Sequence, residues 1–120
     1  MTVTISKQFS FEAAHSLAYL PPTHKCHHLH GHGYGVTVHV KGKLDPALHW
    51  VVDYADISAA WEPVFKKLDH KNLNEVLPMP TTAENLAIWI YDQLRPALPQ
   101  LYAVDVQETA TSNARYQPEG

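Results

Sequence analysis

Apolar and polar residues alternate near the start of the chain with the spacing of β-strands. Residues 2–12 contain Phe9 and Phe11, which share one face of an extended chain, so this segment is predicted to be a strand with one break in phase. Valines alternate with polar residues through residues 33–44 and predict a second strand. The prolines and polar residues of the intervening segment 18–31 predict a loop.

The middle of the chain changes to a spacing of three and four residues, which predicts two helices. The first begins after Asp53, which can cap it, and Pro63 is expected to kink or restart it. The second begins at Thr81 or Thr82, because Thr81 followed three residues later by Glu84 has the form of a capping box.

Strand spacing returns in residues 101–111, and a last short strand is expected near residues 114–116. Two strands, two helices and two further strands predict an α+β fold, with the helices packed on one face of an antiparallel sheet. The edges of so small a sheet are exposed and invite pairing with a second copy of the chain.

Composition narrows the class of protein. A length of 120 residues predicts one domain, residues 1–120. Hydrophobic residues at 45% and charged residues at 18% argue against disorder, and no apolar run approaches the ~20 residues of a membrane span. The N-terminal residues lack the layout of a signal peptide, and a single cysteine excludes an internal disulfide. We therefore expect a cytoplasmic protein without a membrane partner.

Charge is divided unevenly along the chain. Residues 1–44 have a net charge of +3, residues 45–120 have a net charge of −6, and the total is −3. An acidic total argues against nucleic acid as a partner. The basic, histidine-rich first part still suits a small phosphorylated ligand.

Seven of the nine histidines lie within residues 15–39. Residues two apart on a strand share a face, so His30 and His32 can meet one ion. His15 ends the preceding strand, and antiparallel pairing would place it beside them. Three neutral imidazoles favour Zn²⁺ and leave one coordination position open, whereas Cys26 as a fourth ligand would close the site.

Three further groups are candidates for chemistry. Cys26 follows Lys25 and lies near the expected ion, so positive charge favours its thiolate, a base or nucleophile; a buried, inert thiol is the alternative. Asp69 can orient His70 as an acid/base pair, or both can lie in solvent at a helix end. Glu108 is expected on the inward-facing side of its strand, where a carboxylate needs a partner with N–H donors. The alternative is a glutamate at the strand end that lies in solvent.

Five segments, in order along nearly the whole chain, resemble the 6-pyruvoyl-tetrahydropterin synthase superfamily. They are FSFEAAHSL, KCHHLHGHGYGVTVHVKG, VVDYADISAAWEPVFKKLDHKNLN, PTTAENLAIWI and VQETAT. The Cys-x-x-x-His-Gly-His spacing is similar to that of the 6-carboxy-tetrahydropterin synthases of queuosine biosynthesis. Pyruvoyl-forming members place the cysteine two residues further upstream, and other relatives place a glutamate nearer to the His-Gly-His motif.

The resemblance implies a tunnelling fold, a four-stranded antiparallel sheet with two helices on one face. In that family trimers close their sheets into a barrel, and two trimers stack into a homohexamer with sites at subunit interfaces. It also implies a role for each matching residue. The zinc ligands would be His15, His30 and His32; the catalytic residues Cys26, Asp69 and His70; and the pterin-binding residues Glu108, Thr81 and Thr82, the two threonines acting from an adjoining subunit.

The implied reaction converts 7,8-dihydroneopterin triphosphate to 6-carboxy-5,6,7,8-tetrahydropterin, acetaldehyde and triphosphate. One alternative is another reaction of the same fold, either formation of 6-pyruvoyl-tetrahydropterin or an aldolase-like cleavage of dihydroneopterin. A second alternative is a non-catalytic zinc- or pterin-binding protein whose metal is structural.

Overall fold

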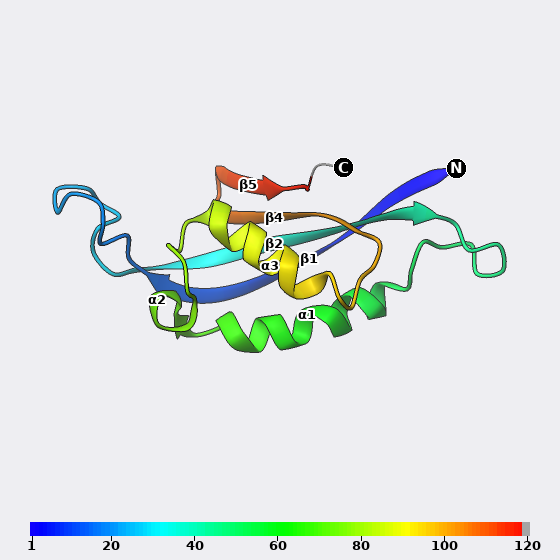
Figure 1. Cartoon of the computed structure of the whole chain (residues 1–120), viewed down its shortest axis with the longest axis horizontal. Coiled ribbons are helices and arrows are strands. Elements are labelled where there is room, and N and C mark those ends of the chain that lie inside the picture. Colours follow the sequence, from blue (N-terminus) through cyan, green and yellow to red (C-terminus); the bar gives the residue numbers. More distant parts are fainter. Residues whose placement is uncertain (119–120) are drawn as a thin grey trace.

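The computed structural model describes residues 1–118, in which one sheet of five strands has the order β3-β1-β2-β4-β5 (Figure 1). Among the strand pairs of this described part, only β1–β3 is parallel. The strands are β1 (Thr2–His15), β2 (His30–Lys43), β3 (Lys71–Asn72), β4 (Leu101–Thr109) and β5 (Ser112–Tyr116).

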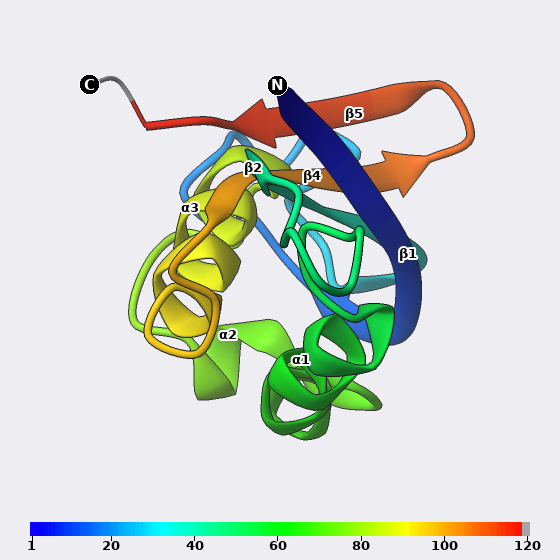
Figure 2. The same ribbon diagram turned by 90° about the vertical axis from the view of Figure 1, so that its right-hand side faces the viewer.

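Three helices accompany the sheet, and α1 and α3 lie on the same side of it (Figure 2). They are α1 (Tyr54–Leu68), α2 (Leu73–Val76) and α3 (Ala83–Leu94). The predicted α+β tunnelling fold is confirmed. The described residues form five strands and three helices, whereas four strands and two helices were expected. The additions, β3 and α2, are two and four residues long, too short to show a hydrophobic period.

Strands β1 and β2 pair without interruption from Thr2 opposite Lys43 to His15 opposite His30. The predicted break in phase is therefore wrong, because the odd-numbered residues of β1 keep one face throughout. Lys7, a partly buried polar residue in that row, produced the irregular pattern. The long antiparallel ribbon brings the end of β1 beside the start of β2, as the sequence predicted.

Helix α1 runs uninterrupted through Pro63, so the predicted restart is wrong. Asp53 caps it as expected, accepting a hydrogen bond from a backbone N–H two residues later. A proline removes one hydrogen bond of the helix. The buried side chains of Ile57, Trp61 and Val64 hold this helix against the sheet, each contributing roughly 1.5–3 kcal/mol.

Helix α3 begins one residue later than the predicted capping box requires. Thr82 is the capping residue, and its Oγ1 accepts a hydrogen bond from the backbone N–H of Asn85 at 3.2 Å. The pairing of Thr81 with Glu84 is therefore wrong. Thr81 is fully buried and directs its polar groups elsewhere.

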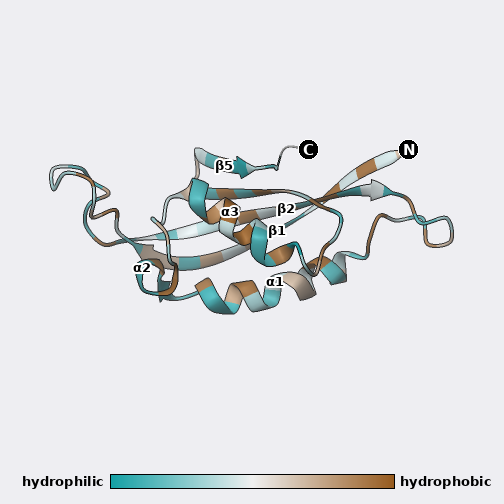
Figure 3. Ribbon diagram, viewed as in Figure 1, coloured by the Kyte–Doolittle hydropathy of each residue, from teal (hydrophilic) through white to brown (hydrophobic). Residues whose placement is uncertain are grey.

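The core lies between the helices and one face of the sheet, and hydrophobic residues recur along α1 and α3 (Figure 3). Phe9 stacks on Trp61 with ring centroids 5.1 Å apart, and Phe11 stacks on Tyr34 at 4.8 Å. The Tyr34 ring in turn contacts His32 edge-on at 5.4 Å. The histidine-rich end of the ribbon is therefore continuous with the packed core. No helix in the described residues is both long and apolar enough to cross a membrane.

Candidate metal centre and active site

Three histidines converge where β1 ends and β2 begins. His15 lies opposite His30 in the strand pairing, and His32 follows on the same face. The ring centroids are 4.6 Å apart for His15 and His30, and 4.8 Å apart for His30 and His32. One nitrogen from each ring lies within 4.8 Å of the others, so the three residues could hold a metal ion.

Two of these rings are oriented by main-chain carbonyl groups. His15 Nδ1 lies 2.7 Å from the carbonyl oxygen of Thr81, and His30 Nδ1 lies 2.7 Å from that of His28. Since a carbonyl oxygen can only accept a hydrogen bond, each Nδ1 carries the proton and donates it. In the neutral form of each ring the lone pair is then on Nε2, while Nδ1–H donates to a carbonyl, the arrangement found in most metal-ligating histidines.

Burial favours the neutral form of two of these imidazoles, His15 and His32. His15 is only 1% exposed, and burial lowers its pKa. Burial also lowers the pKa of His32, against the opposing charge of Glu108. Within residues 1–118, the buried Nε2 atoms of His15 and His32 have no hydrogen-bond partner. Neutral nitrogens that lack a partner fit a divalent cation that takes imidazole ligands.

Cys26 is not a member of this cluster. Within residues 1–118, the group that could hold a metal consists of the three histidines alone. The loop fixes the main chain of Cys26 on both sides: its carbonyl accepts from the Leu17 N–H at 2.8 Å, and its N–H donates to His24 Nδ1 at 3.0 Å. A three-histidine group leaves a coordination position open, which is typical of catalytic zinc sites.

Asp69 and His70 form a hydrogen-bonded pair at the open edge of β1. Asp69 Oδ2 accepts from His70 Nδ1 at 2.7 Å, and its other oxygen accepts from the Glu12 N–H at 3.0 Å. The Glu12 N–H, and then His70, lower the pKa of Asp69. The backbone N–H of His70 donates to the Glu12 carbonyl, and His70 has a positive φ of 57°. The pair is thus fastened to the sheet, with the imidazole exposed.

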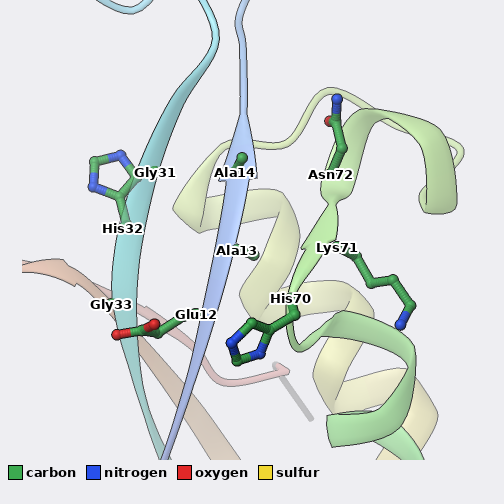
Figure 4. A pocket seen from close by; sticks show the side chains of 9 residues that line it. All are labelled: Glu12, Ala13, Ala14, Gly31, His32, Gly33, His70, Lys71 and Asn72. Carbon is green, nitrogen blue, oxygen red and sulfur yellow. The ribbon is translucent and has the colours of Figure 1, made fainter.

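A pocket lies beside this pair (Figure 4). Its residues include positions of β1 and β2 on the face opposite the helices, residues at the β3 edge, and His32. The lining residues are Glu12, Ala13, Ala14, Gly31, His32, Gly33, His70, Lys71 and Asn72. In the described part of the chain, no hydrogen bond or ion pair joins Cys26 to Asp69 or His70. The meeting of the three proposed catalytic residues therefore stays a prediction.

Glu108 faces the metal centre. The pairing of β2 with β4 puts Val104 and Val106 on the core face, and Glu108 follows in the same phase, as predicted. Its Oε1 lies 3.3 Å from His32 Nε2, and its side chain is 22% exposed. The carboxylate also borders a second pocket, between the start of α3 and the β4–β5 hairpin. It is therefore available to a ligand that reaches the histidines.

At the centre, the contact of Thr81 with His15 was not predicted from the sequence, and neither was the place of Tyr34. Thr81, expected to contact a pterin, is fully buried against His15, and Thr82 caps α3. Tyr34 is fully buried, and burial raises its pKa. Its hydroxyl has no hydrogen-bond partner among the residues that the structure describes. Tyr34 follows His32 by two residues on one strand face, so the strand period could have revealed it. No local signal links Thr81 to His15.

Comparisons with known proteins agree with this geometry. The sequence profile of the 6-pyruvoyl tetrahydropterin synthase family matches residues 4–119. The chain is 40% identical to the 6-carboxy-5,6,7,8-tetrahydropterin synthase of Synechocystis sp., over 93% of this chain and 91% of the relative. It is 36% identical to the human 6-pyruvoyl tetrahydrobiopterin synthase, over 96% and 91%.

The fold has a similar match among solved structures. The 6-pyruvoyl tetrahydropterin synthase of Caenorhabditis elegans superposes with a TM-score of 0.91 at 29% identity. The superposition covers 99% of this chain and 97% of that protein. Sequence and structure therefore agree over nearly the full length of the chain.

Proposed function

This chain belongs to the 6-pyruvoyl tetrahydropterin synthase family, and we propose that it is a zinc-dependent 6-carboxy-5,6,7,8-tetrahydropterin synthase. The proposed substrate is 7,8-dihydroneopterin triphosphate, and the other products are acetaldehyde and triphosphate. The pathway would be the biosynthesis of queuosine or a related deazapurine.

The observation that carries this proposal is an open group of three histidines, two of which form a His-Gly-His motif that begins four positions after the single cysteine. The open group favours catalytic over structural zinc. The cysteine spacing favours the carboxy-forming reaction, and the synthase of that name in Synechocystis sp. is 40% identical to this chain. Formation of 6-pyruvoyl-tetrahydropterin and an aldolase-like cleavage are the alternatives within the family.

Each group of residues would have a different role in the reaction. Zn²⁺ held by the three histidines would supply Lewis acidity toward the hydroxyl groups of the pterin side chain. The Cys26 thiolate would take a proton from that side chain as general base. His70, oriented by Asp69 through Nδ1, presents Nε2 to solvent and would return or remove protons during carbon–carbon cleavage.

Within residues 1–118 no hydrogen bond joins Cys26 to His70, which fits an active site shared between copies of the chain. Across residues 1–118, β1 pairs with β3 only at Ala13 and Ala14, so most of its outer edge is unpaired. β5 forms the opposite edge of the sheet. We propose that such edges join in a homo-oligomer, a hexamer of two stacked trimers, in which the Asp69–His70 pair of one copy approaches the Cys26 of another.

The pterin product tests the proposed reaction against its alternatives. The zinc-loaded protein is incubated with 7,8-dihydroneopterin triphosphate, and the pterin is identified by mass spectrometry. The proposal predicts a tetrahydropterin with a carboxyl group at carbon 6. A product that retains the three-carbon side chain would identify the pyruvoyl reaction, and unchanged substrate would favour a non-catalytic binder.

Replacing Glu108 with glutamine is expected to weaken pterin binding. A carboxylate can accept two hydrogen bonds from the adjacent N–H groups of a pterin ring, and a hydrogen bond to a charged group contributes roughly 1.5–3 kcal/mol. The Kd of a reduced pterin, measured by calorimetry, should rise by about 10- to 100-fold.

Glu84→Gln is the matched control, because Glu84 lines the same pocket but is exposed at the start of α3. It should leave the Kd within about twofold, a change of roughly 0.4 kcal/mol. Zinc content is measured in both variants, since Glu108 lies beside His32. An unchanged pterin affinity in Glu108→Gln would remove Glu108 from the binding site.

A further inference from the structure

Thr81 contacts His15 of the metal centre, although it belongs to the segment that leads into α3. It is fully buried and 66 positions from His15 in sequence. Its carbonyl oxygen is 2.7 Å, and its hydroxyl oxygen 3.1 Å, from the same atom, His15 Nδ1. Two polar groups of one residue therefore converge on one ring nitrogen.

We propose that Thr81 is a positioning residue for His15, holding the ring as the Nδ1–H tautomer with Nε2 toward the cation. The carbonyl cannot donate, so a contact of 2.7 Å requires the proton on Nδ1. The hydroxyl oxygen is a second acceptor for that proton and resists rotation of the ring. This inference rests on the proposed function, because it assumes that the three histidines bind a metal.

The main chain that presents the Thr81 carbonyl is fixed on both sides. Asn85 Nδ2 donates to the carbonyl of Pro80 at 2.9 Å. The backbone N–H of Asn85 donates to Thr82 Oγ1, and that of Leu86 donates to the Thr82 carbonyl. Leu86 is itself fully buried in the core. The first turn of α3 therefore sets the position of the group that orients His15.

Among the described residues, His30, whose Nδ1 also donates to a carbonyl, is not held by a distant part of the chain in this way. His30 Nδ1 donates to His28, which lies two residues away in its own exposed loop. His15 is 1% exposed and is joined to a helix from a distant part of the sequence. We expect His15 to be the preformed ligand of the group, with its orientation set before a metal binds.

The zinc affinity of Thr81 variants tests the role of the side chain, with zinc alone and a competing chelator. Thr81→Val keeps the volume but removes the hydroxyl, and should weaken zinc binding by about tenfold. That is the lower end of the 10–100-fold range for outer-shell partners, because the carbonyl remains. Thr81→Ser keeps the hydroxyl and should stay within about twofold of the native chain on the same scale.

Thr82→Ala separates positioning from general stability. It removes the cap of α3 and should lower the unfolding temperature, yet change zinc affinity less than Thr81→Val does. Equal zinc affinity in Thr81→Val and the native chain would overturn the proposal. So would a loss in Thr81→Val no larger than the loss in Thr82→Ala.

The tautomer of His15 in the metal-free native chain gives a readout that needs no variant. Long-range ¹H–¹⁵N NMR should find the proton on Nδ1, whereas a proton on Nε2 would overturn the proposal. This measurement distinguishes two failures. A native chain that binds no zinc contradicts the proposed function, while the wrong tautomer contradicts the role of Thr81.

Discussion

Replacing His30 with alanine should reduce bound zinc from about one per chain to nearly none, the largest change that we expect in metal content. The three histidines are the only group able to hold a metal in the part of the chain that the structure describes. Two remaining imidazoles supply too few ligands for a stable site. The zinc content after dialysis, determined by elemental analysis, gives the result.

His28→Ala is the matched control for this prediction. His28 lies in the loop just before β2, its side chain is exposed, and its main-chain carbonyl accepts the hydrogen bond from His30. The variant should keep about one zinc per chain, because the ligands and that carbonyl remain. Full zinc occupancy in His30→Ala would refute the proposed ligand set.

Replacing Cys26 with alanine should lower kcat by about 100- to 10,000-fold, the range for loss of a general base. Zinc content should stay at about one per chain, because Cys26 lies outside the histidine group. Steady-state kinetics and elemental analysis of the same preparation measure the two quantities together.

Zinc retention decides between the two roles of this cysteine. If Cys26 were a fourth, structural ligand, its removal would release zinc and lower the unfolding temperature. If it is a base, its removal leaves both near the native values. A variant that keeps full turnover would contradict both roles and leave Cys26 as an inert thiol.

The strand and helix periods predicted most of this architecture because its long elements bury one face each. The end of β1 could be placed beside the start of β2 from spacing alone, and this brought His15 to His30 and His32. Pro63 misled the prediction, because the packing of α1 outweighs the one hydrogen bond that a proline removes.

Contacts between distant segments could not be predicted in this way. Thr81 had the local signature of a capping box, but its polar groups turn to His15 across 66 positions. His39 lies 3.4 Å from Asp105, which pairs with Arg115. Such pairings depend on which strands lie together, and a one-dimensional period does not contain that information.

The structure shows which of the candidate residues are in contact, whereas the resemblance implies their roles in a reaction. The structure brings the three histidines together and joins Asp69 to His70, a contact that adjacency in sequence did not guarantee. The meeting of that pair with Cys26 requires a second copy of the chain under the proposed assembly. The roles of these residues therefore depend on the reaction itself.

Acetaldehyde release from 7,8-dihydroneopterin triphosphate tests the central claim most directly. The zinc-loaded protein is assayed with a coupled alcohol dehydrogenase, beside a metal-free preparation. We expect about one acetaldehyde per substrate consumed, and none without metal, because zinc would supply the Lewis acidity of the reaction. Consumption of the substrate without acetaldehyde, with the three-carbon side chain retained on the pterin, would contradict it.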